Sequence, residues 1–143
     1  MKHLRAKKPL HLLMEEMKGE NRLRRVLGPK ARGAWSLHRQ TLDAGLDFFV
    51  MYSSVAAMIG NAHQPAYAAA NLFLESLAEY RRARGLPALA VAWGAIGETG
   101  YLARNPELRA VMEAGAGVRF LTPGEALATL ERLILAGTAL ACY

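Results

Sequence analysis

Two apolar stretches separated by one helix-length segment constrain the fold of this chain more than any other feature. Residues 46–55 read LDFFVMYSSV and residues 88–96 read ALAVAWGAI, and both are rich in residues that favour β-strands. Near-continuous apolar runs of this length are typical of strands buried on both faces of a parallel sheet. Because two parallel strands need a crossover connection, the pattern predicts a strand–helix–strand unit.

Local signals place helices between and before these strands. Pro65 suits the first turn of a helix predicted over about 64–84, and Gly85 closes it. Pro29 lies where a second helix, over about 29–44, is expected to begin. One face of that second helix is expected to consist of Ala34, Leu37 and Thr41.

The last third of the chain carries a helix start and a final short strand. Thr122, Pro123 and Glu125 form the pattern of a capping box with proline at the first helical position. The segment 138–143 then predicts one more strand. The whole pattern favours an α/β fold with a parallel sheet of about three strands and flanking helices.

Composition narrows the class of protein. The 143 residues suit one domain, and 52% of them are hydrophobic, enough for a buried core. No apolar run approaches the roughly 20 residues of a membrane span. A single cysteine, Cys142, excludes an internal disulfide and offers no metal cluster, so we expect no metal site and a reducing, cytoplasmic setting.

The positive charge is concentrated at the amino-terminal end. Residues 1–39 hold 11 Lys or Arg against 3 Glu, a net charge of +8, while the remainder carries 7 against 9, a net −2. Such a segment can bind nucleic acid or anionic lipid, but a solvated segment is the commoner case. No aromatic residue precedes Trp35 to stack on bases, so we do not expect nucleic-acid binding.

Polar side chains cluster where the first strand passes into the next helix. Ser54 ends that strand, and Tyr67 and Asn71, four residues apart, share one face of the helix. A phenol with a nearby cation can exchange a proton near neutral pH, and Lys30 is a candidate cation. A serine hydroxyl can hold a carbonyl oxygen while charge develops on it. Judged by spacing alone, a core or rim tyrosine is the commoner case.

The same residues carry a family likeness. The stretches LDFFVMYSSVAAMIGNAHQPAYAAANLF, GLPALAVAWG, GPKARGAWSLH and LTPGEALATLERLI resemble the ketoreductase domain of modular polyketide synthases, in the short-chain dehydrogenase/reductase superfamily. The resemblance covers roughly residues 26–143. It implies a Rossmann-like parallel sheet. It also implies reduction of a β-ketoacyl thioester, carried on acyl carrier protein, to the β-hydroxyacyl product.

The resemblance assigns a role to each polar residue. Tyr67 is expected to donate the proton, Ser54 to hold the carbonyl oxygen, Lys30 to stabilise the phenolate and Asn71 to brace the group. The implied cofactor is NADPH. The residues expected to contact it are Lys30, Tyr67, Trp93 and Gly94.

One part of the family pattern is absent from the sequence. The glycine-rich turn that cradles the NADPH pyrophosphate has no convincing counterpart, because the GAIGETG segment at 94–100 opens no clear helix. The expectation is therefore a carboxyl-terminal portion of the domain over 26–143, preceded by a basic segment over 1–25 that is partly helical or disordered. The alternative is an inactive remnant or scaffold piece that docks with a nucleotide-binding half or with itself.

Overall fold

The sheet has three parallel strands in the order β1-β2-β3. The computed structural model describes residues 20–60, 64–97, 104, 107, 110 and 119–142. Strand β1 spans Val50–Ser54, β2 spans Leu89–Trp93 and β3 spans Leu140–Cys142. The register pairs Ser54 with Trp93, so β1 and β2 end at the same edge. The predicted parallel strand–helix–strand unit and the short final strand are confirmed.

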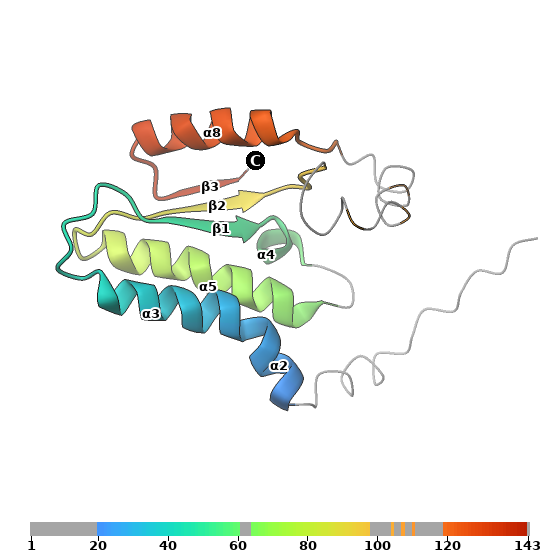
Figure 1. Ribbon diagram of the computed structural model, residues 1–143, viewed down its shortest axis with the longest axis horizontal. Helices are drawn as coiled ribbons and strands as arrows, with labels where there is room; N and C mark the ends of the chain where they lie inside the picture. Colours follow the sequence, from blue (N-terminus) through green and yellow to red (C-terminus); the bar gives the residue numbers. More distant parts are fainter. Residues whose placement is uncertain are drawn as a thin grey trace, which may run out of the picture.

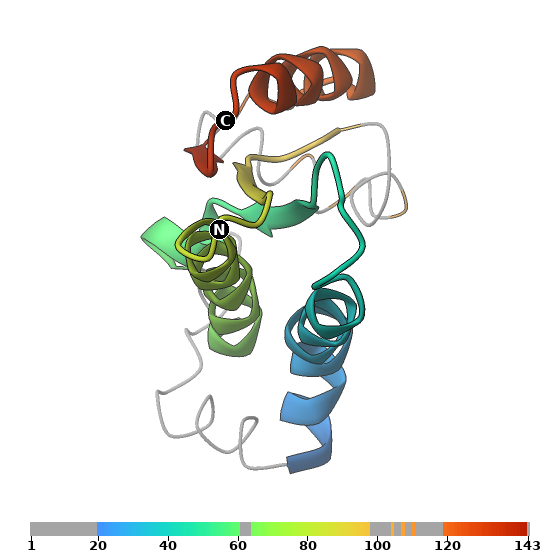
Figure 2. The ribbon, with the colours of Figure 1, turned by 90° about the vertical axis from the view of Figure 1, so that its left-hand side faces the viewer.

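Helices cover both faces of this sheet. Figure 1 shows α8 above the strands and α2, α3 and α5 below them, and Figure 2 shows α5 and α3 side by side under the sheet. The bounds are α2 Glu20–Leu27, a π-helical turn η1 Gly28–Arg32, α3 Gly33–Gln40, α4 Ala56–Ile59, α5 Pro65–Arg82 and α8 Pro123–Leu135. Because the long helix α5 begins at Pro65 and is followed by Gly85 at φ +72°, the predicted start and stop signals are confirmed.

The core is divided into two layers by the sheet. Below it, Leu74 and Leu77 of α5 pack with Met51 and Ala90 of the strands. Above it, side chains of β2 pack against α8: the buried members are Leu89, Val91, Trp93 and Ala126. The central strand β2 is therefore buried along its whole length.

The prediction that β1 is buried on both faces is wrong. Met51 and Ser53 are buried against α5, but Tyr52 between them is 47% exposed and Phe48 is 59% exposed. Strand β1 is an end strand of the described sheet, and the helix on the face away from α5, α8, packs over β2. Its upper face is therefore only partly covered.

The helix expected to begin near Pro29 instead continues from α2, which begins at Glu20 within the segment expected to be partly helical. Proline has no N–H to donate to the preceding turn, and its ring crowds the carbonyl four residues back. The chain continues through Pro29 by widening into the π turn η1, in which the Gly33 N–H donates to the Gly28 carbonyl. Wider turns of this kind often occur at functional sites, and this one carries Lys30.

The buried face of α3 also differs from the prediction. Ala34 is buried, as expected, but Leu37 is 56% exposed and His38 is 2% exposed. His38 Nδ1 lies 3.1 Å from Nη1 of the buried Arg81. Burial, and then the charges of Arg81 and Arg84, lower the pKa of His38. The contact with Arg81 of α5 therefore explains why His38, rather than Leu37, is buried.

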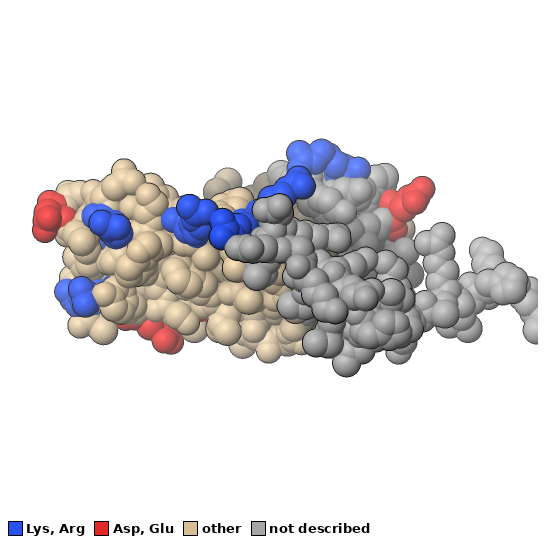
Figure 3. All heavy atoms as spheres, turned by 90° about the horizontal axis from the view of Figure 1, so that it is seen from below, with Lys and Arg blue, Asp and Glu red and all other residues tan. Residues whose placement is uncertain are grey.

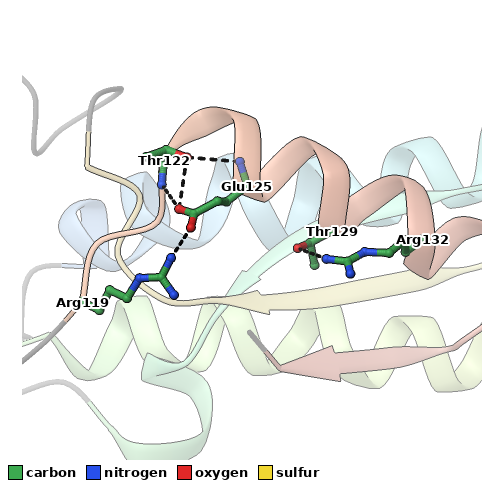
Figure 4. Close-up of polar contacts among 5 residues, drawn as sticks. All are labelled: Arg119, Thr122, Glu125, Thr129 and Arg132. Atoms are coloured by element: carbon green, nitrogen blue, oxygen red, sulfur yellow. Dashed lines mark hydrogen bonds and ion pairs between the residues drawn. The ribbon is translucent and has the colours of Figure 1, made fainter.

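Helix α8 begins with the predicted capping box, which is confirmed (Figure 4). The Thr122 hydroxyl accepts from the Glu125 N–H at 3.2 Å, and the Glu125 carboxylate accepts from the Thr122 N–H at 2.8 Å. The bond from the Thr122 N–H, and then the bond that the Thr122 hydroxyl donates to the same carboxylate at 3.0 Å, lower the pKa of Glu125. Arg119 forms an ion pair with the same carboxylate, and Arg132 bonds Thr129 further along the helix.

Removing this cap should measurably weaken the packing of α8. We expect Thr122→Ala to lower the free energy of unfolding by roughly 1 kcal/mol, because the Glu125 N–H loses its acceptor. Thr122→Ser keeps the hydroxyl and should behave like the wild type. Chemical denaturation of the three proteins measures the difference, and equal midpoints for all of them would contradict the role of the cap.

Basic side chains lie on the solvent side of the lower helices. Figure 3 looks onto this layer and shows Lys and Arg in a band across its described part. Exposed members in α2, η1 and α3 are Arg24, Arg25, Arg32 and Arg39.

Among the described residues, no helix combines the length and apolarity needed to cross a bilayer. The segment 1–19, which holds most of the predicted basic region, lies outside the described residues.

Candidate active site

Lys30 reaches from the π turn to the carboxyl-terminal half of β1. Its ammonium donates to the backbone carbonyl of Tyr52 at 2.7 Å and to Asn71 Oδ1 at 2.6 Å. Partial burial lowers the pKa of Lys30 below its ordinary value. An ammonium has three donors, and the third has no partner among the described residues. One N–H of Lys30 is therefore available to another group at this edge.

Asn71 is completely buried and makes two side-chain bonds of opposite kind. Its Oδ1 accepts from Lys30, and its Nδ2 donates to the Tyr67 carbonyl at 2.8 Å. With the amide oxygen and nitrogen each engaged, the side chain has one orientation. Asn71 thereby connects the lysine on the π turn to the helical turn that carries Tyr67.

Tyr67 lies at the beginning of α5, beside the lysine. The Lys30 ammonium is 5.4 Å from the centroid of the Tyr67 ring, within cation–π range. The structure thus brings three of the predicted residues together, although they come from segments up to 41 residues apart.

Ser54 ends β1 at the same edge of the sheet. Its hydroxyl oxygen accepts from the Ala56 N–H at 3.3 Å, which fixes the side chain in the turn before α4. The hydroxyl proton has no acceptor among the described residues. It can therefore be donated to a ligand, although the structure gives no direct contact between Ser54 and Tyr67.

Trp93 and Gly94 reach the same edge through β2, but the Trp93 side chain lies elsewhere. It is 4% exposed, packs in the layer under α8 and stands 5.7 Å from the Tyr52 ring, on the face of the sheet away from α5. Its indole N–H has no hydrogen-bond partner in the described part of the chain. The structure therefore does not bring the Trp93 side chain to Lys30; only the backbone of Trp93 and Gly94 reaches the edge.

Three contributors to this region were missed by sequence reasoning. The Tyr52 carbonyl has no side-chain signal, because any residue can provide it. Ser53 directly precedes the predicted Ser54, but it points to α5 and donates to Glu75 Oε1 at 2.6 Å. Glu75 follows Asn71 by four residues, so its place on the same helical face was a signal that could have found it.

The described residues contain no cluster of three His, Cys, Asp or Glu side chains able to hold a metal ion. The polar groups at the edge are an ammonium, a phenol, a hydroxyl and a carboxamide. All four groups can form hydrogen bonds with a ligand.

Comparison with known proteins assigns the family. The KR domain family model matches residues 9–98. A highly reducing polyketide synthase of Talaromyces stipitatus is 44% identical over 122 residues, which cover 85% of this chain and 5% of that protein. A phthioceranic/hydroxyphthioceranic acid synthase of Mycobacterium tuberculosis is 41% identical over 115 residues, covering 78% of this chain and 5% of that one. The chain thus spans about a twentieth of these relatives.

Solved structures agree with the sequence matches. An A-type ketoreductase from a modular polyketide synthase superposes with a TM-score of 0.80 at 39% identity, over 85% of this chain and 25% of that one. The first ketoreductase of the tylosin polyketide synthase superposes with a TM-score of 0.70, also at 39% identity, over 85% of this chain and 26% of that one. The chain belongs to the KR domain family, the ketoreductase domains of polyketide synthases in the short-chain dehydrogenase/reductase superfamily.

Proposed function

We propose that this chain provides the proton-transfer half of a ketoreductase that reduces a β-ketoacyl thioester on acyl carrier protein to the β-hydroxyacyl thioester. The observation that supports this most is the bonding of Lys30 to Asn71 beside the Tyr67 ring. Membership of the ketoreductase family suggests the class of reaction, a carbonyl reduction. The four expected residues carry the ammonium, phenol, hydroxyl and carboxamide groups that this reaction would use.

Each residue has a distinct task in this proposal. Ser54 donates its free hydroxyl proton as a hydrogen bond to the substrate carbonyl oxygen, where negative charge develops. Tyr67 transfers its phenolic proton to that oxygen as the carbonyl carbon receives hydride, so the C=O group becomes CH–OH. Lys30 stabilises the phenolate that remains, and Asn71 holds Lys30 in place through the 2.6 Å bond.

NADPH, when bound, supplies the hydride. The described residues fit one end of that cofactor. The third Lys30 donor and the Tyr67 hydroxyl can bond ribose hydroxyls, and the strand ends at Trp93 and Gly94 border the same edge. They do not fit the pyrophosphate, because no described helix start offers a glycine-rich set of N–H groups. In this proposal, polypeptide outside the described residues holds the phosphates.

A second candidate role follows from exposed apolar side chains at β1. Phe48, just before β1, is 59% exposed and Tyr52 within it is 47% exposed. Strand β1 is an end strand of the described sheet, where a further strand can pair. This favours a split-domain interaction piece that docks with a nucleotide-binding half and has no activity by itself. The two roles differ in what the chain does once it is joined to a nucleotide-binding half, because only the first predicts reduction.

One titration separates the two roles. We expect the purified chain alone not to change NADPH fluorescence, and to bind and oxidise NADPH in the presence of a β-ketoacyl thioester after mixing with the amino-terminal portion of a related ketoreductase. Reduction in the mixture supports the reductase. Complex formation on gel filtration without reduction supports only the interaction piece, and neither binding nor reduction would contradict both.

A further inference from the structure

A buried serine–glutamate pair lies beside the candidate site and takes no part in the proposed proton transfer. Ser53 Oγ donates to Glu75 Oε1 at 2.6 Å, and the two residues are 4% and 6% exposed. Hydroxyl-to-carboxylate bonds of about 2.5–2.7 Å are charge-assisted and stronger than neutral ones. Glutamate is almost never buried so deeply unless it is paired, so the bond to Ser53 accounts for its presence here.

On the sheet side, Ser53 stands between the two β1 residues that the site uses. The Tyr52 carbonyl accepts from the Lys30 ammonium at 2.7 Å, and Ser54 carries the hydroxyl proposed to hold the substrate oxygen. Because the three residues are consecutive in one strand, any displacement of Ser53 moves both neighbours.

On the helix side, Glu75 lies one turn beyond Asn71. Ser53 Oγ is also 3.3 Å from the Asn71 carbonyl, so the serine meets α5 at the turn that holds the Lys30 partner. Among the described strands, β1 pairs through its backbone only with β2. The Ser53–Glu75 bond is therefore a restraint on β1 from a second direction, perpendicular to the sheet.

We propose that Glu75 is a positioning residue for this site: through Ser53 it holds the carboxyl-terminal end of β1 against α5, and so fixes the Tyr52 carbonyl under Lys30 and Ser54 at the sheet edge. The catalytic consequence rests on the proposed function. The geometric consequence concerns Lys30 and can be measured on the isolated chain.

The test uses the full chain with four variants, and a fifth, Lys30→Arg, that serves only for assignment. Ser53→Ala removes the donor, Glu75→Leu removes the acceptor at similar volume, and Ser53→Thr keeps the hydroxyl. Glu79→Gln is the matched control, an exposed acid on the next turn of the same helix. The Lys30 side chain is followed by NMR with labelled lysine, assigned by its loss in Lys30→Arg, while thermal unfolding is recorded in parallel.

We expect the Lys30 resonances of Ser53→Ala and Glu75→Leu to titrate closer to the ordinary lysine value than in the wild type. The reason is that displacement of Tyr52 exposes the ammonium to water. Ser53→Thr and Glu79→Gln should titrate like the wild type. A lowered melting temperature with an unchanged Lys30 titration would show a merely structural pair and overturn the proposal. If Glu75→Leu does not fold, Ser53→Ala decides alone.

Kinetics add the catalytic readout. They are measured on the completed reductase, which is this chain mixed with the amino-terminal portion of a related ketoreductase. Ser53→Ala should lower kcat at least about tenfold while KM changes less than about twofold, because the substrate still binds but the reacting groups are misplaced. A higher KM with an unchanged kcat would contradict this. Should no completed form reduce a ketone, the proposed function fails, whereas the Lys30 titration still decides whether Glu75 positions the group.

Discussion

Replacing Tyr67 with phenylalanine is expected to abolish carbonyl reduction by the completed reductase while leaving the fold intact. The substitution removes only the phenolic O–H, and the structure gives that hydroxyl no hydrogen-bond partner within the described residues. Loss of a general acid typically lowers a rate by about 10²–10⁴-fold. Oxidation of NADPH with a β-ketoacyl thioester, followed by absorbance, measures the effect.

A matched control is available on the same helix. Tyr80 lies at the opposite end of α5, 38% exposed, with its ring near those of Trp35 and His38. Tyr80→Phe makes the same chemical change away from Lys30 and should retain the wild-type rate. If Tyr67→Phe also retains it, Tyr67 is not the proton donor and the proposed mechanism fails.

Truncating Leu74 is expected to cause the largest loss of stability. Leu74 is 4% exposed and packs with Met51 and Ala90 where α5 meets the sheet. Leu→Ala changes at such sites cost about 2–5 kcal/mol through lost burial and the cavity left behind. That is a large part of the roughly 5–15 kcal/mol by which a domain is stable. Urea denaturation, monitored by tryptophan fluorescence, measures the loss.

The same helix provides the control for this prediction. Leu72 is 52% exposed, so Leu72→Ala removes the same atoms from a site with little burial and should change the free energy of unfolding by less than about 0.5 kcal/mol. Equal effects of the two substitutions would mean that α5 does not pack on the sheet as described. Because α5 carries Tyr67 and Asn71, a loosened helix also disturbs the site.

Local signals were enough to predict the framework of the fold. The two apolar runs predicted the parallel strands β1 and β2, and Pro65 and Gly85 predicted both ends of α5. Thr122 and Glu125 predicted the capping box. Such signals succeed because caps and turns depend on residues a few positions apart, and because a short apolar run bounded by turn residues indicates a buried strand.

The candidate site was only partly predictable. The family likeness identified Lys30, Ser54, Tyr67 and Asn71, but it did not reveal which of them touch. The structure brings Lys30 to Asn71 across 41 residues of sequence and leaves the Trp93 side chain on the other side of the sheet. The partners Ser53 and Glu75 were not predicted as a pair, because their bond depends on how far α5 lies from β1.

By itself, the sequence determined the order and kind of the main elements, because these follow from hydrophobic period and capping chemistry. Tertiary packing alone decided that the helix passes through Pro29 as a π turn, that His38 is buried instead of Leu37, and that Tyr52 is exposed on β1. Each of these outcomes depends on which surface lies opposite a residue. That surface comes from a distant part of the chain, so no local pattern encodes it.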